Sequence, residues 1–241
     1  MLATQPVFVM KVQETEETTE TIKPFEVSTV LEAVNEILTT KRQLIRTAHD
    51  MFMRLGIKSV SMDDIAREMG VSKKTIYVEV SNKEELIKLV MEDDYCEDMK
   101  TLALNRGEAV DAIDEFLRNS RYFIRQMRAM SPATLRDLQK YYPVIWKSLV
   151  QNHHLEFRKS LTVNLERGLE EGIYRNDMDS IIIARFYSSM MMSVVDTSIF
   201  PAQERSISDI ISQLSRYHFY GIVNQFGRER LDKYLNKEAL E

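Results

Sequence analysis

The chain has 241 residues, of which 44% are hydrophobic, so it can form one large domain or two small ones with a real core. The single Cys96 excludes a disulfide framework and a thiolate-only metal site, and seven glycines with five prolines are too few for the turns of a strand-rich fold. Because no apolar run could span a bilayer and the N-terminus lacks a leader pattern, we expect a soluble, cytoplasmic, all-α protein without a membrane partner.

Charge is distributed unevenly along the chain, whose formal net charge is −5. Residues 1–40 hold two Lys or Arg against seven Asp or Glu, and residues 91–241 hold twenty against twenty-three. Residues 41–90 hold ten against seven, a net +3, and form the only cationic segment. Local charge sets the attraction to phosphates, so a nucleic-acid surface is expected in this segment.

The N-terminal part is predicted to be an acidic, flexible extension over residues 1–36, in which the run ETEETTETIKP ends at Pro24. Apolar residues at helical spacing then continue to Gly56, a natural helix end. Two alternatives remain for residues 25–40: they join this helix, or they form their own, with Thr39-Thr40 as a start signal for the next.

The stretch 61–86 begins with a helix-start signal. Ser61 offers a capping hydroxyl, and Asp64 stands three residues later, in the first turn of a helix predicted over about 62–69. Gly70 then supplies the positive φ that a tight turn requires. The pattern predicts a short helix that stops at a sharp turn.

A second short helix follows the turn. Ser72 is a second N-cap, and the helix is predicted over about 73–79 with Ile76 facing the first helix. The small side chain of Ala66 lets the two helices approach, Gly70 makes the turn, and the aliphatic side chain of Ile76 packs the second helix on the first. This spacing is typical of a helix-turn-helix, although any amphipathic helical hairpin can show it.

The outer face of the second helix carries the side chains that are candidates for contacts with DNA. With Ile76 buried, Lys73, Lys74, Thr75 and Tyr77 lie at the helix start and on its exposed side. In a helix-turn-helix this part of the helix enters the major groove, where lysine reaches phosphates or guanine and hydroxyls donate to phosphates. The alternative interpretation of two adjacent lysines is an ordinary solvated face.

The next segment, SNKEEL, starts a further helix. Ser81 is predicted to cap it, and Lys83 lies in the first turn, where the helix dipole disfavours a cation. A phosphate near Lys83 would remove that penalty, which favours a place for this side chain at a DNA backbone.

The run LIRTAHDMFMRLGIKSVSMDDIAREMGVSKKTIYVEVSNKEEL resembles the DNA-binding domain of TetR-type (tetracycline-repressor-like) transcriptional regulators. The matching positions are Ala48, Phe52, Gly56, Ser61, Ile65, Ala66, Gly70, Val71, Ser72, Thr75, Ile76, Tyr77, Lys83, Glu84, Glu85 and Leu86. One departure is that Glu79 and Val80 replace a usual aromatic pair, which puts a negative charge near the expected DNA backbone.

The resemblance implies a fold and a contact set. The fold would be an N-terminal three-helix helix-turn-helix domain, residues 37–90, followed by a helical ligand-binding and dimerisation domain, residues 91–241. The predicted DNA-binding residues are Ser61, Ser72, Lys73, Lys74, Thr75, Tyr77 and Lys83.

The C-terminal region reads as further helices, near 108–129, 132–140, 143–170, 179–198 and 206–226. The segment SIIIARFYSSMMMSVVDTSIF is apolar almost all round, so it must be covered on all sides. We therefore predict a homodimer in which the last two of these helices, about 179–198 and 206–226, meet their copies across a two-fold axis. An ordinary intrachain core is the alternative.

A ligand pocket is predicted from aromatic residues with polar tips beside methionines, a set suited to a small apolar or aromatic effector. The candidate residues are Tyr122, Phe123, Met127, Tyr142, Trp146, Phe186, Tyr187 and Met190. For each of them alone, plain core is the competing interpretation.

No enzyme, cofactor or metal site is predicted. No nucleophile–base pair, phosphate loop or paired acids stand out. The neighbours His153 and His154 point about 100° apart on a helix and cannot share one ion, and His49 is interpreted as structural.

The leading interpretation is a ligand-responsive transcriptional repressor, dimeric and released from a near-palindromic DNA operator by a small molecule. The alternative is a protein-interaction module whose helix-turn-helix no longer reads DNA, motivated by Glu79 and the acidic N-terminal run. A helical small-molecule enzyme is disfavoured because no catalytic constellation is found.

Overall fold

The computed structural model of the chain describes residues 24–196, 198–201 and 204–238. Over these ranges it is built of helices, with a single antiparallel bridge between Tyr174 and Val223 and no strand, so the predicted all-α fold is confirmed. The chain divides into two compact units, residues 1–40 and 41–241. Of the predicted flexible extension, residues 1–23 lie outside the described ranges, while residues 24–36 are helical.

The first helix, α1, spans Pro24–Leu55, so the start signal at Thr39-Thr40 is wrong and residues 25–40 are part of this helix. Proline suits the first helical position because it has no N–H to leave unpaired there. The helix ends before Gly56, whose φ of 85° is the left-handed conformation that favours glycine.

The next two helices have the predicted bounds, α2 over Met62–Met69 and α3 over Lys73–Glu79. The Ser61 hydroxyl accepts the Asp64 N–H at 3.1 Å, and the Asp64 carboxylate accepts the Ser61 N–H at 2.9 Å, which completes a capping box. Gly70 lies between the two helices with a φ of 67°. Local signals alone therefore define the helix-turn-helix.

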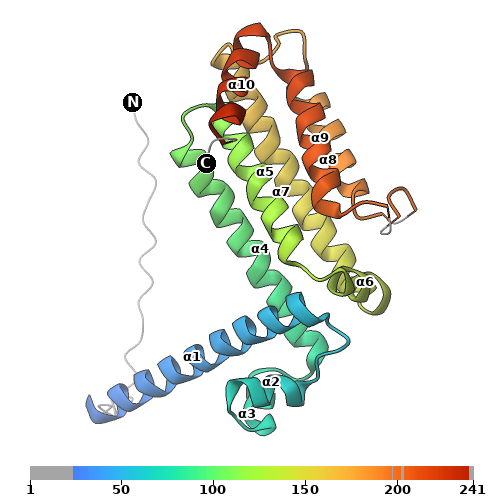
Figure 1. Cartoon of the computed structure of the whole chain (residues 1–241). Helices are drawn as coiled ribbons and strands as arrows, with labels where there is room; N and C mark the ends of the chain where they lie inside the picture. The colour runs from blue at the N-terminus through green and yellow to red at the C-terminus, as the bar shows by residue number, and fades with distance from the viewer. Residues whose placement is uncertain (1–23, 197, 202–203, 239–241) are drawn as a thin grey trace, which may run out of the picture. The chain divides into compact units, whose positions relative to one another are not determined.

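Helix α4 (Lys83–Glu108) joins the helix-turn-helix to the rest of the unit (Figure 1). Its N-cap is Asn82, whose side chain accepts the Glu85 N–H at 2.9 Å, so the prediction of Ser81 as the cap is wrong by one residue. Ser81 instead donates its backbone N–H to the Glu85 carboxylate at 2.7 Å.

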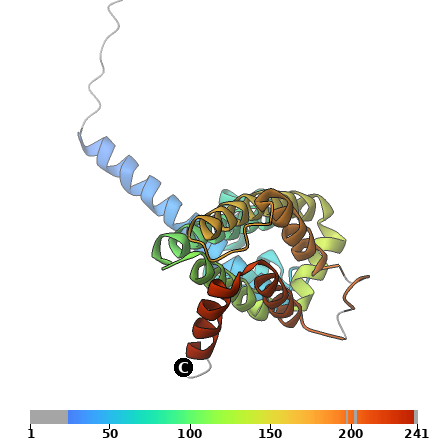
Figure 2. The same ribbon diagram turned by 90° about the horizontal axis from the view of Figure 1, so that it is seen from above.

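The remaining helices form a bundle. They are α5 (Ala112–Ala129), α6 (Pro132–Tyr141), α7 (Pro143–Glu170), α8 (Ser180–Ser193), α9 (Ile207–Ile222) and α10 (Gln225–Glu238). Within the bundle, α5 contacts α4, α7, α9 and α10. Helices α5, α7, α8 and α9 run side by side in Figure 1 and are seen nearly end-on in Figure 2. The short α6 lies at the end of the bundle next to the helix-turn-helix domain.

One helix predicted over 206–226 is two helices in the structure. The carbonyl of Ile222 accepts the Arg175 N–H at 2.9 Å, and the carbonyl of Ile173 accepts the Asn224 N–H at 3.1 Å. Because these two backbone groups bond to the segment 173–175 instead of to their own helix, the helix is interrupted between α9 and α10. The Asn224 side chain then accepts the Gly227 N–H at 2.9 Å and restarts the helix.

Two apolar cores lie inside the second unit. The first joins α1–α4 to Leu138 of α6 and to the start of α7, and its fully buried members include Leu44, Phe52, Ile65, Ile76, Leu86 and Val90. The second joins α5 with α7–α10, and it includes Ile113, Leu165, Tyr174, Tyr187, Phe219 and Leu231. Leu138 of α6 belongs to the first core, so α6 packs on α1–α4 as well as on the bundle.

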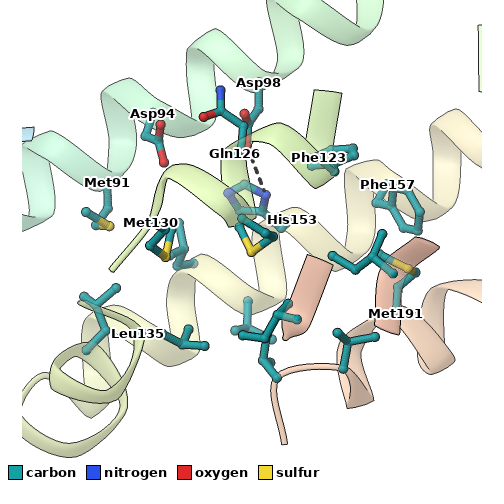
Figure 3. A pocket seen from close by; sticks show the side chains of 18 of the residues that line it. Met91, Asp94, Asp98, Phe123, Gln126, Met130, Leu135, His153, Phe157 and Met191 are labelled. Atoms are coloured by element: carbon teal, nitrogen blue, oxygen red, sulfur yellow. Dashed lines mark ion pairs between the residues drawn. The ribbon is translucent and has the colours of Figure 1, made fainter. Parts of the chain in front are cut away.

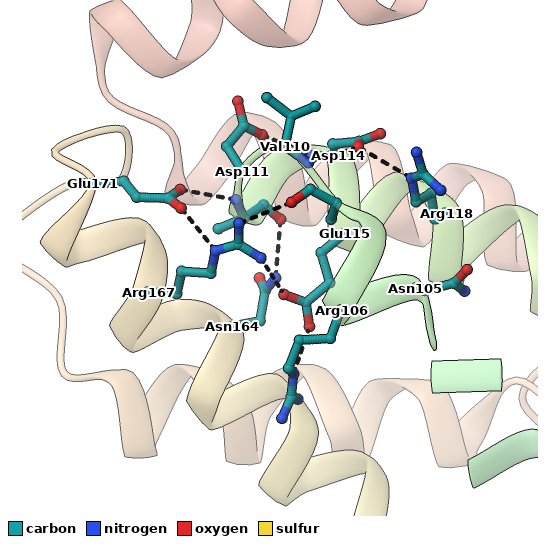
Figure 4. A network of polar contacts seen from close by, with 12 residues as sticks. Asn105, Arg106, Val110, Asp111, Asp114, Glu115, Arg118, Asn164, Arg167 and Glu171 are labelled. Atoms are coloured by element: carbon teal, nitrogen blue, oxygen red, sulfur yellow. Dashed lines mark hydrogen bonds and ion pairs between the residues drawn. The ribbon is translucent and has the colours of Figure 1, made fainter. Parts of the chain in front are cut away.

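A polar network fastens α4, α5 and α7 together (Figure 4). The Glu115 carboxylate, only 1% exposed, receives Nε of Arg106 at 3.2 Å and Nη1 of Arg167 at 3.2 Å. Arg167 also donates to Glu171 at 2.7 Å, and Glu171 in turn accepts the N–H of Ala112 at the start of α5. Each charge is therefore both paired and hydrogen-bonded, the condition under which buried ions are tolerated.

Replacing Glu115 by alanine is expected to lower the free energy of unfolding by about 3 kcal/mol, because two guanidinium groups then face each other without their shared carboxylate. Glu108→Ala is the matched control, since its carboxylate is 67% exposed against Arg118 and its loss should cost less than about 1 kcal/mol. Urea unfolding followed by circular dichroism measures both. Equal small losses would contradict the assignment of this network as a stabilising one.

Candidate functional site

The exposed face of α3 presents the residues predicted to contact DNA. Ile76 is buried at 1% exposure and holds the helix on α2, while Lys73, Lys74 and Tyr77 are exposed. Tyr77 keeps 43% of its surface in solvent, and its neighbour Val78 keeps 73%. The face that points away from the core is thus cationic at its start and aromatic-aliphatic further along, as a groove-reading helix requires.

Lys73 has a partner within the domain, because its Nζ lies 2.9 Å from Asp63 on α2. Both side chains are about half exposed, at 50% and 57%. An exposed pair of this kind is worth roughly 0–1 kcal/mol, so the lysine can exchange Asp63 for a phosphate at little cost. Asp63 holds the side chain at the start of α3, ready for such a contact.

Three of the predicted contact residues take part in helix caps, Ser61 and Ser72 as N-caps and Thr75 as the residue whose N–H is capped. Ser61 is engaged with Asp64, and the Ser72 hydroxyl accepts the Thr75 N–H at 3.1 Å. The hydroxyl oxygens of Ser72 and Thr75 lie 2.8 Å apart. All three residues lie at the exposed ends of α2 and α3, where a capping hydroxyl can also reach a phosphate.

Lys83 lies differently from what its predicted role requires. Its Nζ donates to the carbonyl of Ile57 at 2.6 Å and to that of Val60, and it lies 5.8 Å from the ring centroid of Phe52. Burial lowers the pKa of this ammonium. The cation in the first turn of α4 is therefore balanced by the loop after α1, and no phosphate is needed to explain it.

A cavity of about 240 Å³ lies between the DNA-binding helices and the bundle (Figure 3). Side chains from α1, α4, α5, α6, α7, α8 and α9 line it, most of them methionine, leucine, valine or aromatic. Of the residues predicted for a ligand pocket, it brings together Phe123, Met127 and Trp146. Such an apolar cavity with a few polar groups is the usual form of a small-molecule site.

The other predicted pocket residues lie elsewhere. Tyr122 does not line the cavity but donates its hydroxyl to Asp98, which does, at 2.5 Å. Tyr142 packs against the first core. Tyr187 is 2% exposed and bonds Ser215 at 3.1 Å, so for Tyr142 and Tyr187 the plain-core interpretation fits. Phe186 and Met190 line a groove on the outer face of α8 and α9.

The cavity has one polar wall, which the sequence-based selection missed. Asp94 and Asp98 project from α4, and His153 of α7 faces them (Figure 3). His153 Nδ1 lies 3.7 Å from Asp98, and His49 Nε2 of α1 lies 3.4 Å from Asp94. His49, interpreted from sequence as structural, is thus part of the cavity.

The signal for this wall is present in the sequence. Met91, Asp94, Asp98 and Leu102 follow one another at spacings of three and four, so they share one face of α4. Two acids in an otherwise apolar stripe mark a polar spot inside the fold. In the described ranges no group of three or more His, Cys, Asp or Glu side chains is arranged to hold a metal ion.

The protonation states of the wall follow from burial and pairing. The hydrogen bond to Asp94 raises the pKa of His49 to about 9. Burial raises the pKa of Asp98 to about 7, and burial lowers the pKa of His153. At neutral pH, His49 is therefore protonated beside Asp94, while Asp98 is poised between its neutral and ionised forms.

The cavity is connected to the DNA-binding helices through α6. The Thr134 hydroxyl donates to the Phe52 carbonyl at 2.6 Å, and the Ser131 N–H donates to the Met53 carbonyl at 2.7 Å. Asp137 accepts the N–H of Lys58 at 2.7 Å. Because α6 also contributes Leu135 and Leu138 to the cavity wall, one short helix touches both the cavity and the end of α1.

The outer face of α8 and α9 is apolar and open. Phe186 is 63% exposed, Tyr217 is 73% exposed, and Ile182 and Tyr220 lie beside them. Phe186, Tyr217 and Tyr220 border a groove between the two helices. Together with the exposed Ile182 of α8, they form what we call the α8–α9 face. Among the described helices none is long and apolar enough to cross a membrane.

Residues 44–90 match the family model for bacterial regulatory proteins of the tetR family. The HTH-type transcriptional regulator YfiR of Bacillus subtilis (strain 168) is 23% identical over 176 residues, which cover 69% of this chain and 84% of that relative.

Two solved structures share the fold. A transcriptional regulator from Cytophaga hutchinsonii ATCC 33406 has a TM-score of 0.64 at 13% identity, covering 75% of this chain and 97% of that one. A transcriptional regulator from Saccharomonospora viridis in complex with choline has a TM-score of 0.56 at 18% identity, covering 78% and 99%. The family match covers the helix-turn-helix and the solved structures share the all-helical fold, so residues 44–90 form a DNA-binding domain of the tetR type within an all-helical chain.

Proposed function

We propose that the protein is a ligand-responsive repressor that leaves a near-palindromic operator when a small molecule occupies the cavity. The observation that carries the proposal is the composition of the cavity wall, which includes His49 and Met53 of α1 together with residues of the bundle. A ligand there contacts the helix that supports the helix-turn-helix core. Occupancy and the position of the DNA-binding helices are therefore physically linked.

Two contacts couple ligand binding in the cavity to the position of the helix-turn-helix. The first is the hydrogen-bonded junction of α6 with the end of α1, through Thr134 and Ser131. The second is the ion pair of His49 with Asp94, which joins α1 to α4 across the polar wall. A ligand that displaces α6 or competes for Asp94 shifts both helices. To switch operator occupancy it must favour the non-binding geometry by a few kcal/mol.

The repressor is proposed to act as a homodimer through the α8–α9 face. A two-fold axis there pairs Phe186 and Tyr217 with their copies and covers an apolar surface that otherwise faces water. The two α3 helices would then enter successive major grooves about 34–36 Å apart. In this scheme residues 37–90 form the DNA-binding domain, residues 91–241 bind ligand and partner, and the protein works in the cytoplasm.

Trp146 offers a direct test, because it is the only tryptophan of the chain and lines the cavity. We expect compounds that change its fluorescence to weaken binding to an operator obtained by selection from random duplexes, by about 5- to 150-fold. Trp146→Phe should abolish the optical signal and retain operator release. Compounds that occupy the cavity without any effect on operator affinity would contradict the proposal, and so would a selection that enriches no duplex.

A further inference from the structure

We propose, building on the ligand-cavity function above, that the effector is an organic cation with an apolar body, an amine or quaternary ammonium whose charge is received by Asp98. Among the residues that the structure describes, Asp94 and Asp98 are the carboxylates of the cavity wall, and no lysine or arginine lines it. An anionic effector would meet these acids, and the imidazolium of His49 is already paired with Asp94. The wall thus selects the sign of the ligand charge.

In the described part of the cavity wall, Asp98 is the acid without a cationic partner at short range. Asp94 has the imidazolium of His49 at 3.4 Å. Asp98 receives the Tyr122 hydroxyl on Oδ1, and its Oδ2 has only His153 at 3.7 Å, an imidazole that burial keeps neutral. Only 10% of the Asp98 side chain is exposed, so the fold already bears the cost of desolvating its carboxyl group. A ligand cation supplies the missing charge.

The proton balance of binding follows from these partners. The charged or titratable groups around Asp98 are Asp94 on its own helix, His49 of α1, Tyr122 of α5 and His153 of α7. Because burial raises the pKa of Asp98 to about 7, the empty site holds a proton on this carboxyl in weakly acidic solution. A fixed cation expels that proton to solvent. A neutral amine instead takes the proton onto its nitrogen and becomes the ammonium.

The rest of the cavity suits the body of such a cation. Phe123, Trp146 and Phe157 present aromatic rings, which attract a cation at their faces. Met91, Met130 and Met191 add flexible thioethers that adapt to an irregular apolar shape (Figure 3). About 240 Å³ accommodates a single ring or a short branched chain beside the charged group.

The test titrates the intact protein with three probes that share a benzyl group: benzyltrimethylammonium, its uncharged isostere neopentylbenzene, and the anion phenylacetate. Titration against Trp146 fluorescence should show the cation binding at least about tenfold more tightly than the isostere, and the anion not at all. The cation affinity should rise by close to tenfold per pH unit between about pH 5 and 7 and then level, because only ionised Asp98 receives it.

Asp98→Asn keeps an oxygen for the Tyr122 hydroxyl and removes the charge, so it should abolish both the cation preference and the pH dependence. Asp93→Asn, an exposed acid of the same helix, should change neither. Calorimetry of the wild type near pH 6 gives a reading independent of any variant, with about one proton released per cation bound. The assignment of a cation fails if the isostere binds equally well, whereas failure of all three probes counts against the ligand cavity itself.

Discussion

Reversing both lysines at the start of α3, in Lys73→Glu/Lys74→Glu, is expected to weaken binding to the selected operator by at least about a hundredfold. In a dimer the change replaces four cations at the DNA surface by four anions. Each lysine that neutralises a phosphate contributes about 0.9 to the slope of log affinity against log salt. The slope should therefore fall by up to about 3.6, four times that amount, if all four side chains contact phosphates.

Two further variants make this prediction specific. Lys73→Gln/Lys74→Gln removes the charges without introducing repulsion, and it should lose less affinity than the reversal while showing a similar loss of salt dependence. Lys100→Glu/Lys159→Glu changes the net charge equally on exposed helix faces outside the helix-turn-helix, where each lysine pairs with a glutamate at 2.6 Å. It should retain most of the affinity, because the effect depends on position rather than on net charge.

Gel shift at several salt concentrations measures these affinities, and circular dichroism confirms that each variant is folded. If the reversal leaves operator affinity and salt slope unchanged, α3 does not touch the DNA. In that case the exposed face of α3 would be a protein-binding surface, as the alternative interpretation of the sequence holds.

The helix-turn-helix could be predicted to the residue because its signals are local. The side chains of Ser61 and Ser72 cap helices that begin at the next residue, and Gly70 is the turn residue whose positive φ ends the first one. Each signal acts over at most four residues, so no knowledge of the tertiary structure is needed. At α4 the predicted cap, Ser81, is one residue too early, because both Ser81 and Asn82 are residue types that cap helices and the structure uses Asn82.

The break between α9 and α10 could not be predicted in this way. Apolar residues continue at helical spacing through it, from Ile207 to Phe226, and only the Asn224 cap marks the restart. The helix ends because the segment 173–175, fifty residues earlier, pairs with its last carbonyl and with the following N–H. A tertiary contact of this kind overrides the local helical preference.

The cavity is likewise a product of long-range packing. Phe186 and Tyr187 are neighbours in the sequence, yet one is exposed on the α8–α9 face and the other is buried in the bundle core. The aromatic residue type alone therefore does not predict whether a side chain lines the cavity, packs in the core or lies on the surface. The stripe of Met91, Asp94 and Asp98 did carry information, since acids on the buried face of a helix need a partner.

The second large expected effect concerns the α8–α9 face. The double variant Phe186→Asp/Tyr217→Asp is expected to lose the dimer. Both side chains are well exposed in the single chain, at 63% and 73%, so the change should leave the fold of the protomer intact. Across a two-fold interface it buries four carboxylates near one another, and even one unpaired buried charge costs several kcal/mol. Light scattering should report a monomer at concentrations where the wild type is a dimer.

Operator binding provides a second reading of the same variant. A dimer engages two half-sites, and the second contact profits from an effective concentration that raises affinity by about 10²–10⁴. The monomeric variant should therefore lose that factor on the full operator and bind an isolated half-site as well as the wild type does. Leu104→Asp, with 63% exposure on α4, is the matched control and should remain dimeric. A variant that stays dimeric with full operator affinity would move the interface to another surface.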